Sequence, residues 1–133
     1  MQVDFSRLDK QKTIVIRIRG RVSAEDIRDM RRQTVAEAEE TEYSNFIMDI
    51  RDLESIDSGD TFATFELGEE FNDIGFSRQN NTAVLMPTDE EARRQAEFLH
   101  TVEINRHRGA LLYVDTVEEA LSWFEDMGNK QAL

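Results

Sequence analysis

Short apolar runs alternate along this chain with segments that begin like amphipathic helices, and this alternation constrains the fold more than any other feature. Three such segments open with Ser or Thr followed three residues later by an acidic residue, which is the capping-box pattern. In that arrangement the hydroxyl and the carboxylate satisfy backbone N–H groups that the first helical turn leaves without partners. The three pairs are Ser23 with Asp26, Thr88 with Glu91, and Thr116 with Glu119.

The apolar runs between these segments are too short for typical helices, so we expect them to be strands. Residues 3–8 and 13–19 flank the polar residues 9–12, and the second run ends in alternating apolar and polar side chains before Gly20. This spacing predicts an antiparallel hairpin with one solvated face. The remaining runs lie between helical patterns and predict parallel strands at residues 45–53, 82–86 and 110–114.

Helical patterns are expected over residues 24–40, from Ser58 to about Phe71, from Thr88, and from Thr116. The order ββαβαβαβα is typical of an α/β domain whose mostly parallel or mixed β-sheet is flanked by about four helices. No internal repeat and no Pro/Gly/Ser-rich linker interrupts the sequence. We therefore expect a single domain over residues 1–133, with the N-terminal antiparallel hairpin at one edge of the sheet. The apolar positions at helical spacing that should face the sheet are Ile27, Met30, Val35, Ala38, Ala92, Ala96, Leu99, Val102, Val117, Ala120, Leu121 and Phe124.

The charge balance narrows the classes of partner. Sixteen Lys and Arg against 28 Asp and Glu give a formal net charge of −12, which opposes binding to phosphate backbones and to anionic lipid surfaces. The absence of cysteine excludes disulfides, thiolate metal ligands and thiol catalysis. The N-terminal residues do not resemble a secretory signal, and no run approaches the ~20 apolar residues of a membrane-spanning helix. We therefore expect a cytoplasmic protein that neither binds nucleic acid nor inserts into a membrane.

The third expected strand runs into an acidic turn, where residues 46–59 read FIMDIRDLESIDSG. This stretch resembles the hallmark strand and loop of STAS domains, in which a strand of the form Asp-Leu leads to an Ile-Asp-Ser-Ser-Gly or Met-Asp-Ser-Thr-Gly turn and then to a helix. The order of elements on both sides also fits, so the resemblance covers nearly the whole chain. Residues 113–124, YVDTVEEALSWF, are similar to the close of a STAS branch that is sometimes grouped with SEC14-like lipid-binding domains.

The resemblance implies a non-enzymatic regulatory module, similar to the anti-sigma-factor antagonists, that binds a protein partner such as a regulatory kinase or an anti-sigma factor. In those members the Ser after the motif Asp is phosphorylated by the partner kinase, and phosphorylation weakens binding to that partner. The matching residue here is Ser58, with Gly59 in place of the second hydroxyl and Asp60 in place of the usual glycine. The expected partner-binding loop consists of Ser55, Asp57, Ser58, Gly59 and Asp60.

Simpler roles remain open for the same turn. Asp57 or Ser58 would cap the second helix, a role worth about 1 kcal/mol. A phosphate on Ser58 would be attracted by the helix N-terminus but repelled by Glu54, Asp57 and Asp60. The carboxylates from Asp49 to Asp60 are also the ligand type that Mg²⁺ prefers, although they do not match the calcium-loop spacing. We expect a solvated acidic rim there, with no metal ion and no cofactor.

The sequence shows no pattern of a nucleophile with its general base, and no pair of carboxylates whose environments would separate their pKa values. We therefore do not expect an enzyme. The two histidines, His100 and His107, lie among charged residues near the end of the third expected long helix, where surface positions are typical. No nucleophile-elbow, dinucleotide-binding or P-loop motif occurs.

An alternative function is a carrier or sensor for a small apolar, lipid-like ligand. Its pocket would be lined by Phe65, Phe71, Ile74 and Phe76 in and after the second expected helix. The same side chains would otherwise fold down over the core, because a domain of this size needs that burial. Trp123 is expected at the margin of the sheet, with a homodimer contact as the other possibility.

Overall fold

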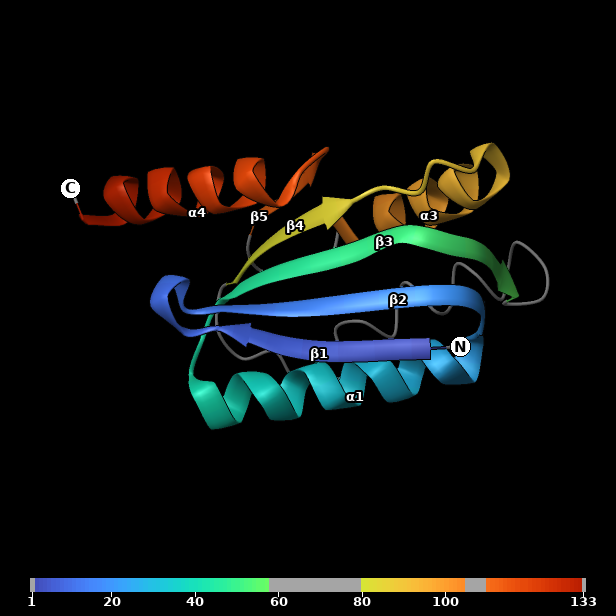
Figure 1. Cartoon of the computed structure of the whole chain (residues 1–133), viewed down its shortest axis with the longest axis horizontal. Coiled ribbons are helices and arrows are strands. Elements are labelled where there is room, and N and C mark those ends of the chain that lie inside the picture. The colour runs from blue at the N-terminus through green and yellow to red at the C-terminus, as the bar shows by residue number, and fades with distance from the viewer. Residues whose placement is uncertain (1, 58–79, 105–109, 133) are drawn as a thin grey trace.

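The structure is a computed structural model that describes residues 2–57, 80–104 and 110–132 (Figure 1). The helix expected from Ser58 to Phe71 lies outside these residues. The elements are β1 (Gln2–Leu8), a 3-10 turn η1 (Asp9–Gln11), β2 (Thr13–Ser23), α1 (Ala24–Thr41), β3 (Asn45–Asp57), β4 (Asn81–Leu85), α3 (Glu90–Ile104), β5 (Ala110–Val114) and α4 (Val117–Ala132).

The five strands form one mixed sheet in the order β1-β2-β3-β4-β5. β1 and β2 pair antiparallel as the predicted hairpin, and β2, β3, β4 and β5 pair with their neighbours in parallel. The expected α/β class, the antiparallel edge and the central position of β3 are therefore confirmed. No described helix is both long and apolar enough to cross a membrane.

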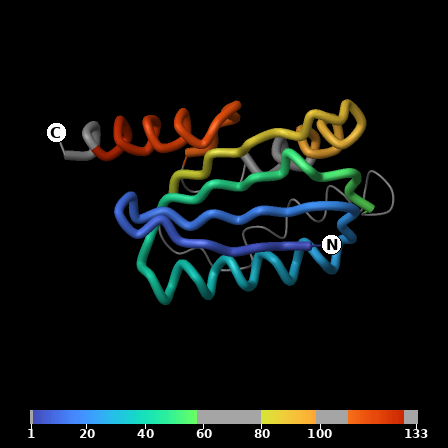
Figure 2. Tube along the Cα trace, in the orientation of Figure 1, coloured from blue at the N-terminus to red at the C-terminus, as the bar shows by residue number. Residues whose placement is uncertain are grey.

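Each face of the sheet carries its own apolar cluster, and the two clusters use alternate residues of the same strands. On one face Ile14, Ile16 and Phe46 pack with side chains of α1 and with Ala96 of α3. On the other face Ile47 and Leu85 pack against α4. Figures 1 and 2 show α1 and α4 on opposite sides of the sheet, as this alternation requires.

The predicted inward faces of the helices are confirmed where their side chains are described, except at Val35, which is half-buried and belongs to neither apolar cluster. Ile27, Met30 and Ala38 of α1 are buried, as are two alanines of α3 and Ala120 and Phe124 of α4. Arg31 and Thr34 are also buried on α1, which the apolar pattern did not predict. Leu99 and Val102 lie beyond the described side chains.

The helix caps agree with two of the three predicted capping pairs. The Ser23 hydroxyl accepts from the Asp26 N–H at 3.1 Å, and the Asp26 carboxylate accepts from the Ser23 N–H at 3.0 Å, which completes the box. The Thr116 hydroxyl accepts from the Glu119 N–H at 3.1 Å. At α3 the prediction was wrong, because Asp89 and not Thr88 accepts the capping bond, from the Ala92 N–H at 2.9 Å.

β3 is two residues longer than the stretch of β2 with which it pairs. The register shifts between Arg17 and Arg19 and again between Gly20 and Arg21, so each shift inserts one extra residue into β3. Such bulges turn a strand and re-aim its side chains. Gly20 has φ 85° beside the second shift, a backbone conformation that glycine adopts at low cost. As a result β3 reaches Asp57, whereas the sequence analysis ended the strand at Leu53.

Candidate functional site

The C-terminal ends of β2 and β3 form the rim of the sheet from which the predicted partner-binding loop departs. Ser55 pairs with Arg21 and is half-buried, and Asp57 pairs with Ser23 and is exposed. Both residues were expected in a loop, but β2 continues to offer a pairing partner through Ser23 and keeps them in the strand. Ser58, Gly59 and Asp60 lie outside the described residues.

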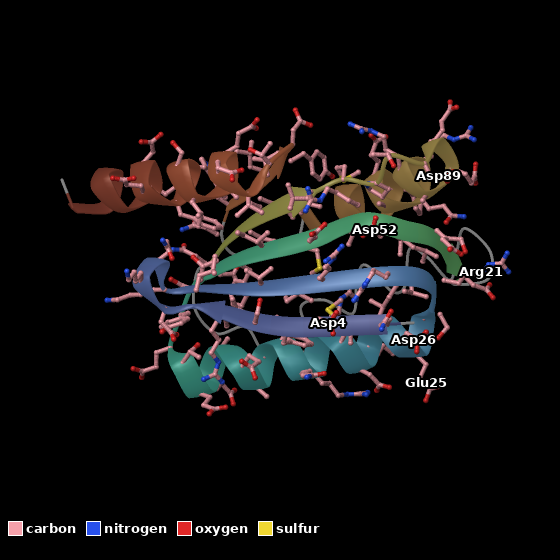
Figure 3. All side chains as sticks on the ribbon, in the orientation of Figure 1. Asp4, Arg21, Glu25, Asp26, Asp52 and Asp89 are labelled. Atoms are coloured by element: carbon pink, nitrogen blue, oxygen red, sulfur yellow. The ribbon has the colours of Figure 1, made fainter. Side chains whose placement is uncertain are left out.

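Two helices begin at this rim and fix its shape. The side chain of Gln95, from the second turn of α3, accepts a hydrogen bond from the Ile56 N–H at 2.7 Å and so ties the end of β3 to α3. Ser23 is both the last residue of β2 and the N-cap of α1, which places the start of that helix opposite Asp57. Figure 3 shows Arg21, Asp26 and Asp89 at this same end of the molecule.

The rim is rich in acidic side chains. The Asp26 carboxylate accepts a hydrogen bond from the Ser23 backbone N–H, which holds the pKa of Asp26 below its usual range. This carboxylate therefore remains charged at neutral pH. Glu25, Asp57 and Asp89 are exposed around it. A partner surface that meets this rim would therefore carry basic groups.

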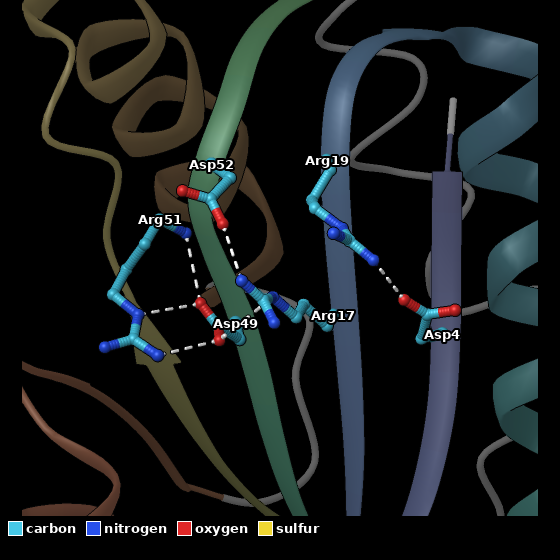
Figure 4. Close-up of polar contacts among 6 residues, drawn as sticks. All are labelled: Asp4, Arg17, Arg19, Asp49, Arg51 and Asp52. Carbon is cyan, nitrogen blue, oxygen red and sulfur yellow. Dashed lines mark hydrogen bonds and ion pairs between the residues drawn. The ribbon is translucent and has the colours of Figure 1, made fainter.

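A ladder of arginines and aspartates leads from the middle of the sheet toward the rim, on the face opposite α1 (Figure 4). At its centre Asp49, only 6% exposed, accepts hydrogen bonds from the Arg51 Nε at 3.0 Å and the Arg51 Nη2 at 2.9 Å. The Arg51 backbone N–H adds a third bond at 3.2 Å. Arg17 lies 3.9 Å from the same carboxylate and donates to Asp52 at 2.9 Å.

The pKa of Asp49 is the net result of opposed effects. Burial by itself would raise the pKa of this carboxyl, but the hydrogen bonds from Arg51 and the charges of Arg51 and Arg17 outweigh burial and lower it. The carboxylate is therefore ionised at neutral pH and held in one orientation. Because its oxygens interact with Arg51 and Arg17, Asp49 has a structural role in the ladder.

Two further pairs extend the ladder, one toward the β1 edge of the sheet and one toward the rim. Arg19 of β2 donates to Asp4 of β1 at 2.7 Å, and Arg21 lies 4.0 Å from Glu54. These pairs are exposed, so each stabilises the fold by only ~0–1 kcal/mol. The sequence analysis did not predict the ladder. The spacing of two apolar residues in β3 was the available sign of it. Ile50 and Leu53 are three positions apart, which in a regular strand would put them on opposite faces, yet both are buried on the face that α1 covers.

The carboxylates between Asp49 and Asp60 were the possible ligands of a cation, and the arginine ladder separates those that the structure describes. Asp49 and Asp52 are bonded to arginines, while Asp57 lies at the rim. Within the part of the chain that the structure describes, no three His, Asp or Glu side chains gather in a way that could hold a metal ion. Asp60 lies outside that part.

The apolar pocket expected from Phe65, Phe71, Ile74 and Phe76 falls entirely outside the described residues. At the opposite end from the rim, a groove of about 590 Å³ lies between the hairpin turn and α4. Lys10, Asn45 and Glu125 line it together with Leu121 and Phe124. Its mixed lining differs from the aromatic pocket that the sequence suggested.

The described residues thus form an antiparallel hairpin that leads into a parallel sheet, with helices on both faces and with Ile56 and Asp57 at the C-terminal end of the central strand. Solved structures with a similar fold cover more than 90% of the chain. A candidate anti-sigma factor antagonist from Thermotoga maritima superimposes with a TM-score of 0.57 at 18% identity, over 92% of this chain and 94% of that one.

The anti-sigma factor antagonist SpoIIAA in its unphosphorylated form gives a TM-score of 0.54 at 16% identity, over 93% of this chain and 98% of its own. An uncharacterised protein from Shewanella loihica with a SpoIIAA-like fold gives 0.53 at 15% identity, over 92% of both chains. No protein-family model matches the sequence, and no curated protein matches it either. The chain therefore has the SpoIIAA-like fold.

Proposed function

We propose that the chain is a non-enzymatic regulatory module of the STAS type that binds a protein partner through the rim from Ser55 to Asp60. The main observation behind this proposal is that the lengthened β3 places Asp57 at an exposed position opposite the start of α1. The likeness in fold to anti-sigma factor antagonists over more than 90% of the chain supports the same class of function. A regulatory kinase or an anti-sigma factor is the kind of partner we expect, in the cytoplasm.

The shape of the rim favours recognition of a surface over chemistry on a small substrate. Gln95 fixes the backbone at Ile56, and the capping box fixes the first turn of α1 on the other side. A surface that is held in place in this way, as these described residues are, loses little conformational entropy when a partner binds, which benefits affinity. Its exposed carboxylates select a basic partner surface and raise the rate of encounter.

Replacing Asp57 with Arg should weaken binding of the partner at least about tenfold, because a rim charge of the wrong sign repels a basic surface. The measurement is quantitative mass spectrometry of proteins that co-purify with the tagged chain from its own host, followed by titration of the purified partner. The matched control is Glu39→Arg, the same charge change at an exposed position near the end of α1, far from the rim. Equal binding by both variants would contradict the proposed rim.

Ser58 is the expected switch within this rim. We predict a phosphopeptide that contains Ser58 in the chain purified from its host, absent from the Ser58→Ala variant. Ser58→Glu should weaken partner binding at least about tenfold, since it adds negative charge beside Asp57 and Asp60. If phosphate never occurs at Ser58 under any growth condition while Asp57→Arg still abolishes binding, the rim is the binding site but is not switched by phosphorylation.

A further inference from the structure

The two edges of the sheet differ in how they discourage pairing with another strand. β1, at one edge, carries Asp4 and Arg7 among its seven residues. β5, at the other edge, has the sequence ALLYV, with no charge, proline or glycine. Charged side chains and prolines are the usual means by which proteins protect an edge strand, so β5 lacks the protection that β1 has.

Exposed apolar side chains gather at this same edge. Among the described residues the large hydrophobic side chains classed as exposed are Leu112 and Tyr113, at 40% and 39%, and Phe98 of α3, at 39%. Burial and the nearby Glu97 raise the pKa of Tyr113, which places α3 beside this part of β5. Among the described residues, the exposed large apolar side chains are therefore concentrated around β5.

We propose that β5 pairs antiparallel with β5 of a second copy of this chain, so that two five-stranded sheets become one continuous sheet. The pairing register follows from the backbone. The Ala110 N–H donates to the Asn80 carbonyl at 3.0 Å, so Ala110, Leu112 and Val114 direct their backbone groups toward β4. Leu111 and Tyr113, in alternation, direct theirs toward the outer edge.

The sequence of β5 is self-complementary in this register. With the two-fold axis at Leu112, Leu111 lies opposite the partner's Tyr113 and Ala110 opposite the partner's Val114. A small residue then faces a branched one on one side of the sheet, and a leucine faces an aromatic ring on the other, which are favourable cross-strand combinations. The two Leu112 side chains meet at a non-hydrogen-bonded position, where facing Cα atoms are only about 4.5 Å apart.

That short separation supplies a direct test, because it suits a disulfide and the natural chain contains no cysteine. Under mild oxidation Leu112→Cys should become a covalent dimer, seen on a non-reducing gel. Ser6→Cys, at an exposed position of the protected edge strand β1, should stay monomeric and controls for random collision. If Leu112→Cys forms no more covalent dimer than Ser6→Cys, the pairing is wrong.

The unmodified chain should sediment as a species of twice the chain mass at micromolar concentration. Leu112→Lys should raise the dimer dissociation constant at least about tenfold, since it buries two charges at the axis. The variant chain should still fold cooperatively, because Leu112 is 40% exposed in the single chain, and its unfolding midpoint should lose the concentration dependence that dimerisation gives the unmodified chain. A monomeric wild type overturns the proposal, even if another protein is then found to bind β5. A Leu112→Lys variant that remains fully dimeric overturns it as well.

Discussion

Replacing Ile47 with alanine is expected to lower the free energy of unfolding by about 3 kcal/mol. Ile47 is fully buried on the central strand, in the smaller of the two clusters, with Leu85 of β4 and Phe124 of α4. Alanine removes three carbon atoms and leaves a cavity between a rigid sheet and one helix, neither of which can close it without breaking strand pairing. Urea denaturation followed by circular dichroism measures the change.

The conservative variant Ile47→Val provides the matched control. It removes one methylene and keeps the β-branched shape, so we expect a loss of about 1 kcal/mol. The two variants together measure how tightly α4 packs on the sheet. A loss below about 1 kcal/mol for Ile47→Ala would mean that this site collapses easily and that α4 contributes little to the second core.

Replacing Arg51 with alanine should destabilise the domain by about 2–3 kcal/mol, although the Arg51 side chain is 44% exposed. The reason is the residue that it leaves behind. Asp49 is 6% exposed, and in Arg51→Ala it would lose both hydrogen bonds from the guanidinium group. It would keep the bond from the backbone N–H of residue 51, with Arg17 at 3.9 Å as its nearest cation. A buried carboxylate with an incomplete set of partners is costly.

The control for this prediction is Arg32→Ala, which breaks an exposed pair with Asp29 on α1 and should cost no more than about 0.5 kcal/mol. Adding Asp49→Asn to Arg51→Ala should restore part of the lost stability, because the neutral amide removes the buried charge. If Arg51→Ala is no more destabilising than Arg32→Ala, Asp49 is better solvated than its burial indicates.

The pH dependence of stability gives an independent readout of the same pair. The folded pKa of Asp49 lies below its unfolded value of about 3.9, so its contribution is fully present above that pH and is lost as pH falls through the folded pKa. Removing Arg51 takes away the main cause of the lowered pKa. The acid-induced loss of stability should therefore be smaller in Arg51→Ala than in the wild type.

Local patterns in the sequence were sufficient for the elements and their order. The apolar run from Ile14, which ends in alternation of Ile16 and Ile18 with arginines, identified β2, and the Ser23–Asp26 box identified the start of α1. These features depend on neighbours one to four residues away, which a sequence shows directly. The cap of α3 was misassigned because Thr88 and Asp89 are adjacent and both are good capping residues.

The tertiary structure decided the length of β3, the charged ladder and the burial of Arg31. The strand extends to Asp57 because β2 supplies a pairing edge as far as Ser23, and two bulges reconcile their unequal lengths. Strand pairing places Asp49 opposite Arg17, a residue 32 positions earlier in the chain, and Asp52, which follows the first bulge, bonds to the same arginine. The sequence by itself therefore determined which segments are helices and strands, since local spacing controls them. Which charges meet, and which sheet edge stays apolar and open, depends on pairing between distant strands, and only the folded chain brings those strands together.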